Sequence, residues 1–168
     1  KILLKKLIKN NQKIFLLACG VDNRSLIYAN EKKFRYSILT PYFENSSLKK
    51  EYKQTLKYLS PSYSRLSEYV KNIVSGIISS DLDYHIPYRG TEKYLGMIPN
   101  PINIDKLKKP YSIKRNKIHI LHSINSKNKI KKGNEIFEKS LSIIEKKYSN
   151  KIKVIRTIDN SYSAHIKN

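Results

Sequence analysis

The sequence is poor in several residue types, and each shortage excludes something. Of its 168 residues, one is cysteine, none is tryptophan and 5 are glycine. A single cysteine excludes a disulfide framework and fits a reducing compartment. The few glycines form neither of the Gly-rich fingerprints that mark dinucleotide-binding folds and P-loops, so both classes are disfavoured. Acidic residues are also scarce, 13 against 34 lysines and arginines, and the net charge is therefore +21.

This positive charge has two explanations. Clustered lysine and arginine release counterions from polyphosphates, which would indicate nucleic acid or an anionic membrane surface. Abundant Lys, Asn, Ile, Tyr and Ser beside scarce Gly, Ala, Trp and Arg are also typical of an AT-rich coding sequence, so the charge can be drift on solvated faces. The tyrosines fall mostly in apolar stripes, so nucleic acid is not the partner that we expect.

The ends of the chain carry little targeting information. The opening segment KILLKKLIKN is too short and too often interrupted by lysine for a signal peptide or a membrane-spanning helix. We therefore expect a cytoplasmic protein. Because the chain starts with Lys1 and ends in SYSAHIKN, we expect an internal fragment of a longer protein.

Cys19 lies in the apolar run KIFLLAC, where a buried, unreactive thiol is expected.

Apolar periodicity predicts strands that alternate with helices. Short apolar runs between turn residues predict buried strands, and apolar spacings of three and four predict amphipathic helices. Strands are expected at 13–20, 34–39, 72–79, 94–99, 117–124 and 151–158, and helices at 48–59, from Ser60 or Ser62 to Ile73, and at 134–148. A strand, a helix and a strand within about forty residues form a right-handed parallel crossover. The predicted fold class is α/β, with two open parallel sheets.

A change in composition marks a domain boundary. Asn100 and Pro101 are followed by the Lys- and Pro-rich segment KLKKPYSIKRN, at residues 106–116. We therefore expect one domain at residues 1–105, a linker at 106–116 and a second domain at 117–168.

The loop NSKNKIKKG follows the predicted strand 117–124 and ends where a helix is predicted to begin. Ligands of open α/β sheets bind at the carboxyl ends of strands, and the unpaired N–H groups of a helix start attract anions. Gly133 would let the backbone approach a phosphate or diphosphate closely. The ammonium groups come from Lys127, Lys129, Lys131 and Lys132. A solvated turn that needs glycine for backbone freedom explains the same residues equally well.

The histidines give weaker signals. His119 and His122 are three apart on a predicted strand, so they point to opposite faces and cannot share a metal ion. His85 follows the polar turn SSDLD, where Asp81 or Asp83 would complete an acid/base pair. A surface histidine near carboxylates is the commoner situation. No spacing of a nucleophilic triad is visible, so the sequence assigns no catalytic residue.

The order of IPNP, a strand, a loop ending in Lys-Lys-Gly and a helix resembles the glycosyltransferases of the GT-B fold. It is similar in particular to the bacterial group 1, family-4-like, retaining nucleotide-sugar transferases. The matching residues are Ile98, Pro99, Asn100, Pro101, Ile102 and Asn103, then His122 and Ser123, then Lys132, Gly133 and the helix NEIFEKSL. The resemblance implies fragmentary parts of two Rossmann-like parallel-sheet domains. Residues 1–105 look like the later part of the family's acceptor domain, and 117–168 like the truncated start of its donor domain. His122 and Ser123 replace the family's Gly-Arg, and the family's later Glu-rich motif has no counterpart.

This resemblance implies a glycosyltransferase that transfers a sugar from a nucleotide-diphosphate sugar to a glycan or lipid-linked acceptor, in cell-envelope polysaccharide synthesis. Lys132 would contact the donor diphosphate, with Gly133 admitting the backbone. Lys127 or Lys129 would take the place of the family's arginine, although an ammonium lacks the planar fork of a guanidinium. The other donor-cleft candidates are His122, Ser123 and Asn134, and the acceptor-side candidates are His85 and Asp83.

Several expectations about partners follow from the resemblance. No cofactor and no metal ion are expected, because lysines would supply the charge that stabilises the leaving group. The isolated fragment is expected to be inactive, because half of the donor cleft is absent. A basic surface would suit peripheral association with the inner face of the membrane. The alternatives are a basic α/β nucleic-acid-binding module and a non-catalytic GT-B relative that acts as a scaffold.

Overall fold

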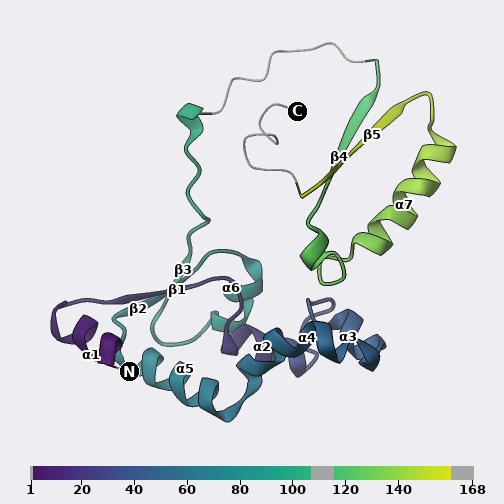
Figure 1. Ribbon diagram of the computed structural model, residues 1–168. Coiled ribbons are helices and arrows are strands. Elements are labelled where there is room, and N and C mark those ends of the chain that lie inside the picture. The colour runs from purple at the N-terminus through teal and green to yellow at the C-terminus, as the bar shows by residue number, and fades with distance from the viewer. Residues whose placement is uncertain (1, 107–115, 160–168) are drawn as a thin grey trace. The chain divides into compact units, whose positions relative to one another are not determined.

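The computed structural model describes residues 2–106 and 116–159 (Figure 1). The chain divides into two compact units, Lys1–Pro101 and Ile102–Asn168. Each unit contains a sheet of parallel strands, so the predicted α/β class is confirmed. The division falls after Pro101, a few residues before the expected boundary, and most of the expected linker lies outside the described residues.

The first unit contains a three-stranded parallel sheet in the order β1-β2-β3. The strands are β1 Phe15–Ala18, β2 Gly76–Ser79 and β3 Tyr94–Met97. Strands were predicted in all three places. The prediction for β2 began too early, because its first residues, Asn72 and Ile73, end the preceding helix.

The helices of the first unit lie between and around these strands. They are α1 Ile2–Lys9, α2 Asn23–Asn30, α3 Thr40–Glu44, α4 Lys49–Leu56, α5 Pro61–Ile73 and α6 Leu82–Tyr88. The predicted helix 48–59 is confirmed as α4 and a following 3-10 turn, Lys57–Leu59. Pro61 begins α5 because proline has no N–H to lose at the first helical position.

One face of the sheet forms the core of this unit. Ala18, Val74 and Ile77 are buried together with Tyr84 and Tyr88 of α6. The core therefore joins the sheet to the helix that follows β2.

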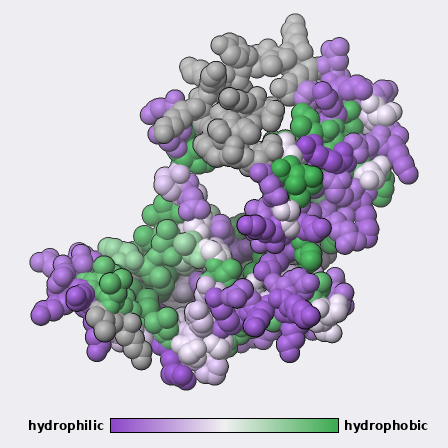
Figure 2. All heavy atoms as spheres, viewed as in Figure 1, coloured by the Kyte–Doolittle hydropathy of each residue, from purple (hydrophilic) through white to green (hydrophobic). Residues whose placement is uncertain are grey.

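The opposite face of the sheet is exposed. Phe15 and Leu17 of β1 and Leu95 and Met97 of β3 are 41% to 62% exposed. Figure 2 shows hydrophobic side chains gathered over this region of the first unit. Parallel sheets normally have both faces covered, so this surface is unusual for its sheet type.

The strand predicted at 34–39 was wrong. These residues form bends and a turn that lead into α3. The backbone N–H of Ser37 donates to Thr40 Oγ1 at 2.8 Å, and that of Leu39 donates to Ser37 Oγ at 3.1 Å. Such local side-chain bonds occupy the donors that a strand would use, and they outweigh the apolar pattern.

Two further expectations in this unit were wrong. Cys19 is exposed rather than buried, because β1 ends at the buried Ala18 and the chain then leaves the sheet. Helix α6 begins at Leu82, within SSDLD, so Asp83 and His85 lie on a helix rather than in a loop. Asp81 caps that helix, since its side chain accepts from the N–H of Asp83 at 3.0 Å.

The second unit is a strand–helix–strand crossover, as predicted. Its elements are β4 Ile118–Ile124, α7 Asn134–Lys147 and β5 Ile152–Ile158, with short 3-10 turns at Ile104–Lys106 and Ser126–Asn128. The strands are parallel and in register from Ile118 opposite Ile152 to Ile124 opposite Ile158. Leu141 of α7 is 2% exposed and provides the buried apolar anchor of the helix.

Within the described parts of the chain, no helix has both the length and the apolar character that crossing a bilayer requires.

Candidate functional site

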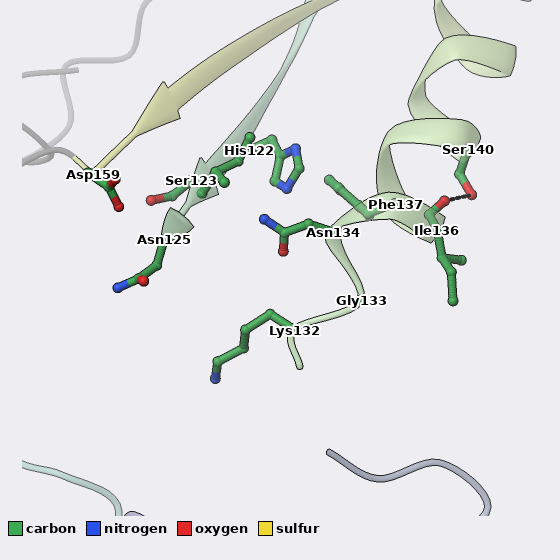
Figure 3. Close-up of a pocket in the computed structure, with 11 residues that line it drawn as sticks. His122, Ser123, Asn125, Lys132, Gly133, Asn134, Ile136, Phe137, Ser140 and Asp159 are labelled. Atoms are coloured by element: carbon green, nitrogen blue, oxygen red, sulfur yellow. Dashed lines mark hydrogen bonds between the residues drawn. The ribbon is translucent and has the colours of Figure 1, made fainter. Parts of the chain in front are cut away.

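An open cleft of about 690 Å³ lies at the carboxyl ends of β4 and β5, beside the start of α7 (Figure 3). Parallel strands end at the same edge of a sheet, and the loops there form the usual ligand site of open α/β sheets. The lining residues are His122, Ser123, Ile124, Asn125, Lys132, Gly133, Asn134, Ile136, Phe137, Ser140 and Asp159. The cleft therefore lies entirely within the second unit.

Most of the donor-site residues expected from the sequence meet in this cleft. His122 and Ser123 come from the end of β4, whereas Lys132, Gly133 and Asn134 come from the loop and the first residue of α7. Lys127 and Lys129 belong to the same loop but are not among the residues that line the cleft. Lys132 is thus the lysine whose position best suits a ligand there.

The loop between β4 and α7 coils tightly and satisfies its own backbone. The N–H of Lys132 donates to the carbonyl of Asn128 at 3.0 Å, and that of Gly133 donates to Ile130 at 3.1 Å. The N–H of Asn134 donates to the carbonyl of Lys129 at 3.1 Å. These three N–H groups are therefore not available to an anion, and at the helix start the expectation of unpaired N–H groups was wrong for Asn134.

Gly133 has a conformational role. Its φ of 66° and ψ of 26° lie in the left-handed region, where a residue with a Cβ is strained. A Cβ at this position would have no heavy atom within 4 Å, so space does not demand glycine. The interpretation of Gly133 as a residue required by the turn explains its presence without a ligand.

Lys132 offers an available ammonium group. Its side chain is exposed, and Nζ has no hydrogen bond or ion pair with any of the residues described. Figure 3 shows the side chain extending from the loop, away from α7. An unpaired ammonium at the edge of a cleft suits an anionic ligand.

His122 is the most deeply buried polar residue of the cleft. It is 6% exposed, and its Nδ1 lies 2.6 Å from Glu138 Oε1. The ring also packs edge-on against Phe137, with ring centroids 4.6 Å apart. The imidazole is therefore fixed between β4 and α7.

Glu138 is shared between His122 and Arg156. The Arg156 Nε lies 3.1 and 3.0 Å from the two Glu138 oxygens, and its other nitrogens donate to Glu145 at 3.2 and 2.9 Å. Partial burial raises the pKa of Glu138, but hydrogen bonds from Arg156 and His122 outweigh it and hold that pKa below its usual value. Hydrogen bonds to Glu145 and Glu138 raise the pKa of Arg156. Both carboxylates are ionised at neutral pH.

The sequence did not single out this network. Arg156 lies directly opposite His122 in the strand register. Glu138 lies on the helix face that turns toward both residues. A charged residue on the second strand, opposite a buried histidine, is the signal that could have revealed the pair.

Asp159 provides a carboxylate in the cleft that was also missed. It follows β5, and its backbone N–H donates to the carbonyl of Ile124 at 2.9 Å. Its side chain accepts from the Ser126 N–H at 2.9 Å and from the Ser126 hydroxyl. These hydrogen bonds lower the pKa of Asp159. The carboxylate thus ties the loop after β4 to the end of β5.

The acceptor-side candidates lie in the first unit. His85 Nδ1 is 2.7 Å from the hydroxyl oxygen of Tyr94, which in turn lies 2.6 Å from Ser79 Oγ. Asp83 lies two residues before His85 on α6, a spacing at which helical side chains do not face each other. His85 therefore takes part in a hydrogen-bond chain with Tyr94 and Ser79.

Comparison with known proteins gives no relatives. The chain matches no model of a protein family, no curated protein and no solved structure. Among residues 2–106 and 116–159, no three His, Cys, Asp or Glu side chains are grouped so that they could hold a metal ion. The absence of a cofactor and of a metal requirement stays a prediction.

Proposed function

We propose that this chain carries part of the donor site of a glycosyltransferase, which transfers a sugar from a nucleotide-diphosphate sugar to a glycan or lipid-linked acceptor. The observation behind the proposal is that Lys132, Gly133 and Asn134 meet His122 and Ser123 in one cleft at the strand ends. The same residues form the motif that resembles the GT-B family. We also propose that this transfer belongs to the synthesis of cell-envelope polysaccharides.

The composition of the cleft supports a ligand with both phosphates and hydroxyl groups. Lys132 provides a cation for phosphate oxygens, and Asn125 and Asp159 provide groups that hydrogen-bond hydroxyls. The volume of about 690 Å³ is in the range of known small-molecule sites. A nucleotide-diphosphate sugar contains both kinds of group.

In the proposed reaction, Lys132 acts by electrostatic stabilisation. Negative charge grows on the nucleotide diphosphate as its bond to the anomeric carbon breaks and the acceptor hydroxyl attacks that carbon. A cation placed beside the diphosphate stabilises this charge more strongly in the transition state than in the ground state. The acceptor and the remaining half of the donor site are not assigned to residues of this chain.

Binding of nucleoside diphosphates tests the proposal directly. We expect UDP, GDP or ADP to bind the chain in isothermal titration calorimetry, and Lys132→Ala to weaken that binding by roughly 10- to 100-fold, the effect of losing one charge-assisted hydrogen bond. Lys139→Ala is the matched control, because Lys139 pairs with the exposed Glu135 outside the cleft. Absence of binding, or equal affinity in the two variants, would contradict the proposal.

Salt dependence separates this proposal from nucleic-acid binding. A nucleic-acid-binding module should bind a single-stranded oligonucleotide with an affinity that falls linearly with salt on logarithmic axes. Such binding, with no competition from a nucleoside diphosphate, would favour the nucleic-acid alternative.

A further inference from the structure

The cleft contains a second group that can carry positive charge, the imidazole of His122. We propose that His122 binds an anionic phosphate oxygen through Nε2 in its imidazolium form, so that phosphate binding in this cleft is coupled to the uptake of one proton. The inference rests on the proposed function only for the identity of the ligand, a phosphate ester.

The hydrogen bonds of His122 fix which nitrogen faces the cleft. Glu138 is ionised, so it can only accept, and Nδ1 must therefore carry the proton of the 2.6 Å bond. Within the described part of the chain, the other ring nitrogen has no hydrogen-bond partner, although the residue lines the cleft. Figure 3 shows the His122 ring and the Asn134 amide pointing into the same space.

Asn134 adds an unpaired donor at this point. Its Nδ2 is buried and has no hydrogen-bond partner among the described residues. A buried donor without a partner destabilises the protein, and an acceptor on a ligand would remove that cost. A phosphate oxygen between Asn134 Nδ2 and His122 Nε2 would accept from both groups.

The tautomer then explains why protonation is needed. With Nδ1 protonated, neutral imidazole presents a lone pair at Nε2, which repels a phosphate oxygen. Imidazolium presents an N–H at the same place and donates. The same ring can therefore bind phosphate in one protonation state and not in the other.

The charges around His122 favour this protonation when an anion is bound. On the protein side, α7 contributes Glu138 and Glu145, and β5 contributes Arg156. Two carboxylates share one guanidinium, so the cluster has one excess negative charge that an imidazolium balances. On the cleft side lie Lys132 and Asp159. A bound phosphate would add negative charge beside the imidazole, which favours its charged form.

A purely structural role is the alternative explanation. The bond from His122 to Glu138 joins β4 to α7, and it would do so without any ligand. In that case binding would not depend on the protonation of His122. The experiment must therefore measure protons as well as affinity.

Calorimetry with inorganic pyrophosphate measures both. We would titrate the chain from about pH 5.5 to about pH 8.5, the range in which imidazole titrates, in buffers of different ionisation enthalpy. We expect uptake of one proton by the protein, with affinity falling about tenfold per pH unit on the alkaline side. In His122→Gln, the proton uptake by the protein and the fall in affinity that it causes should vanish. The pH dependence that comes from the titration of pyrophosphate itself should remain, because it is the same for both proteins.

The matched control lies on the same strand. His119 is exposed and points to the other face of β4, so His119→Gln should keep the proton uptake of the wild type. Lys132→Ala should weaken binding at every pH but keep the coupling. Should His122→Gln fail to fold, the ring signals of His122 in NMR provide a second measurement. Their titration should move to higher pH on addition of pyrophosphate, and an unchanged titration would overturn the inference.

The outcomes separate this inference from the proposed function. Binding that needs Lys132 but shows no proton uptake by the protein overturns the role of His122 and leaves the donor site standing. Pyrophosphate binding with proton uptake, but without binding of any nucleoside diphosphate, supports His122 and overturns the donor site. Absence of binding by both ligands overturns both.

Discussion

His85 in the first unit and His122 in the second each form a hydrogen bond through Nδ1, but to partners of different kinds. His85 bonds to the Tyr94 hydroxyl, which continues to Ser79. His122 bonds to the carboxylate of Glu138, which Arg156 also binds. The first chain contains no carboxylate or guanidinium, whereas the second holds an imidazole against a charged network beside a cleft. The chemical role of a histidine therefore depends on its hydrogen-bond partners rather than on the local sequence.

The helix starts of the two units differ in a similar way. Asp81 caps α6, because its side chain accepts from the N–H of Asp83 and its carbonyl accepts from the N–H groups of Tyr84 and His85. At α7 the N-terminal cap is Gly133, with no side-chain hydrogen bond. The loop backbone supplies the carbonyls there, and side chains such as Lys132 stay available. Positive charge occurs throughout the chain. The start of α7 is therefore distinguished less by its charge than by an ammonium group, that of Lys132, without a partner among the described residues.

The largest expected effect tests whether the two units are independently stable. Leu141→Ala should destabilise the second unit by about 2–5 kcal/mol, because it removes a buried leucine from the helix–strand contact. Amides of β4 and β5 should lose protection in hydrogen exchange, and those of β1 to β3 should keep it. Ile143→Ala, at a position 67% exposed, should have almost no effect. Equal loss of protection in both units would show that they unfold together.

A smaller effect is expected at the start of α7. Gly133→Ala should cost about 1–2 kcal/mol, the penalty for a Cβ in the left-handed region. Gly133→Asn should cost less, because asparagine tolerates this conformation better than other residues. Urea unfolding followed by circular dichroism measures both. Equal stability of the wild type and the alanine variant would show that the left-handed turn does not persist in solution.

The corresponding change in the first unit concerns the cap of α6. Asp81→Ala should cost about 1 kcal/mol in urea unfolding, because it leaves the N–H of Asp83 without its partner. Asp81→Ser restores an acceptor and should recover most of the loss. A serine variant as unstable as the alanine variant would mean that the cap contributes little to α6.

The smallest effect concerns the pH dependence of stability in the second unit. The pKa values of Glu138 and Glu145 are lowered in the folded state, so their ionised forms stabilise the fold above the unfolded pKa of about 4.3. This stability is lost as the pH falls through the lower, folded values. Arg156→Met removes the shared partner and should flatten the acid side of a plot of urea midpoint against pH. An unchanged plot would indicate that the exposed network contributes nothing measurable.

Local signals predicted much of the fold and part of the site. The apolar runs that became β1, β3, β4 and β5 were found because short buried strands need continuous apolar residues. The segment 34–39 failed because Ser37 and Thr40 form local hydrogen bonds that compete with a strand. The cleft residues near Lys132 were found from their order along the chain, since a parallel crossover brings a loop to the strand ends.

By itself, the sequence determined where the strands of the second unit and α7 lie, and that a basic loop precedes this helix. Only the tertiary structure decided which of those groups are available. It paired the N–H groups of the loop with nearby carbonyls, exposed Cys19, and joined His122 to Glu138, 16 residues away, and Arg156 to Glu138, 18 residues away. Periodicity reports which face of an element is apolar, but the partner of a polar group depends on the register and packing of elements that are distant in sequence.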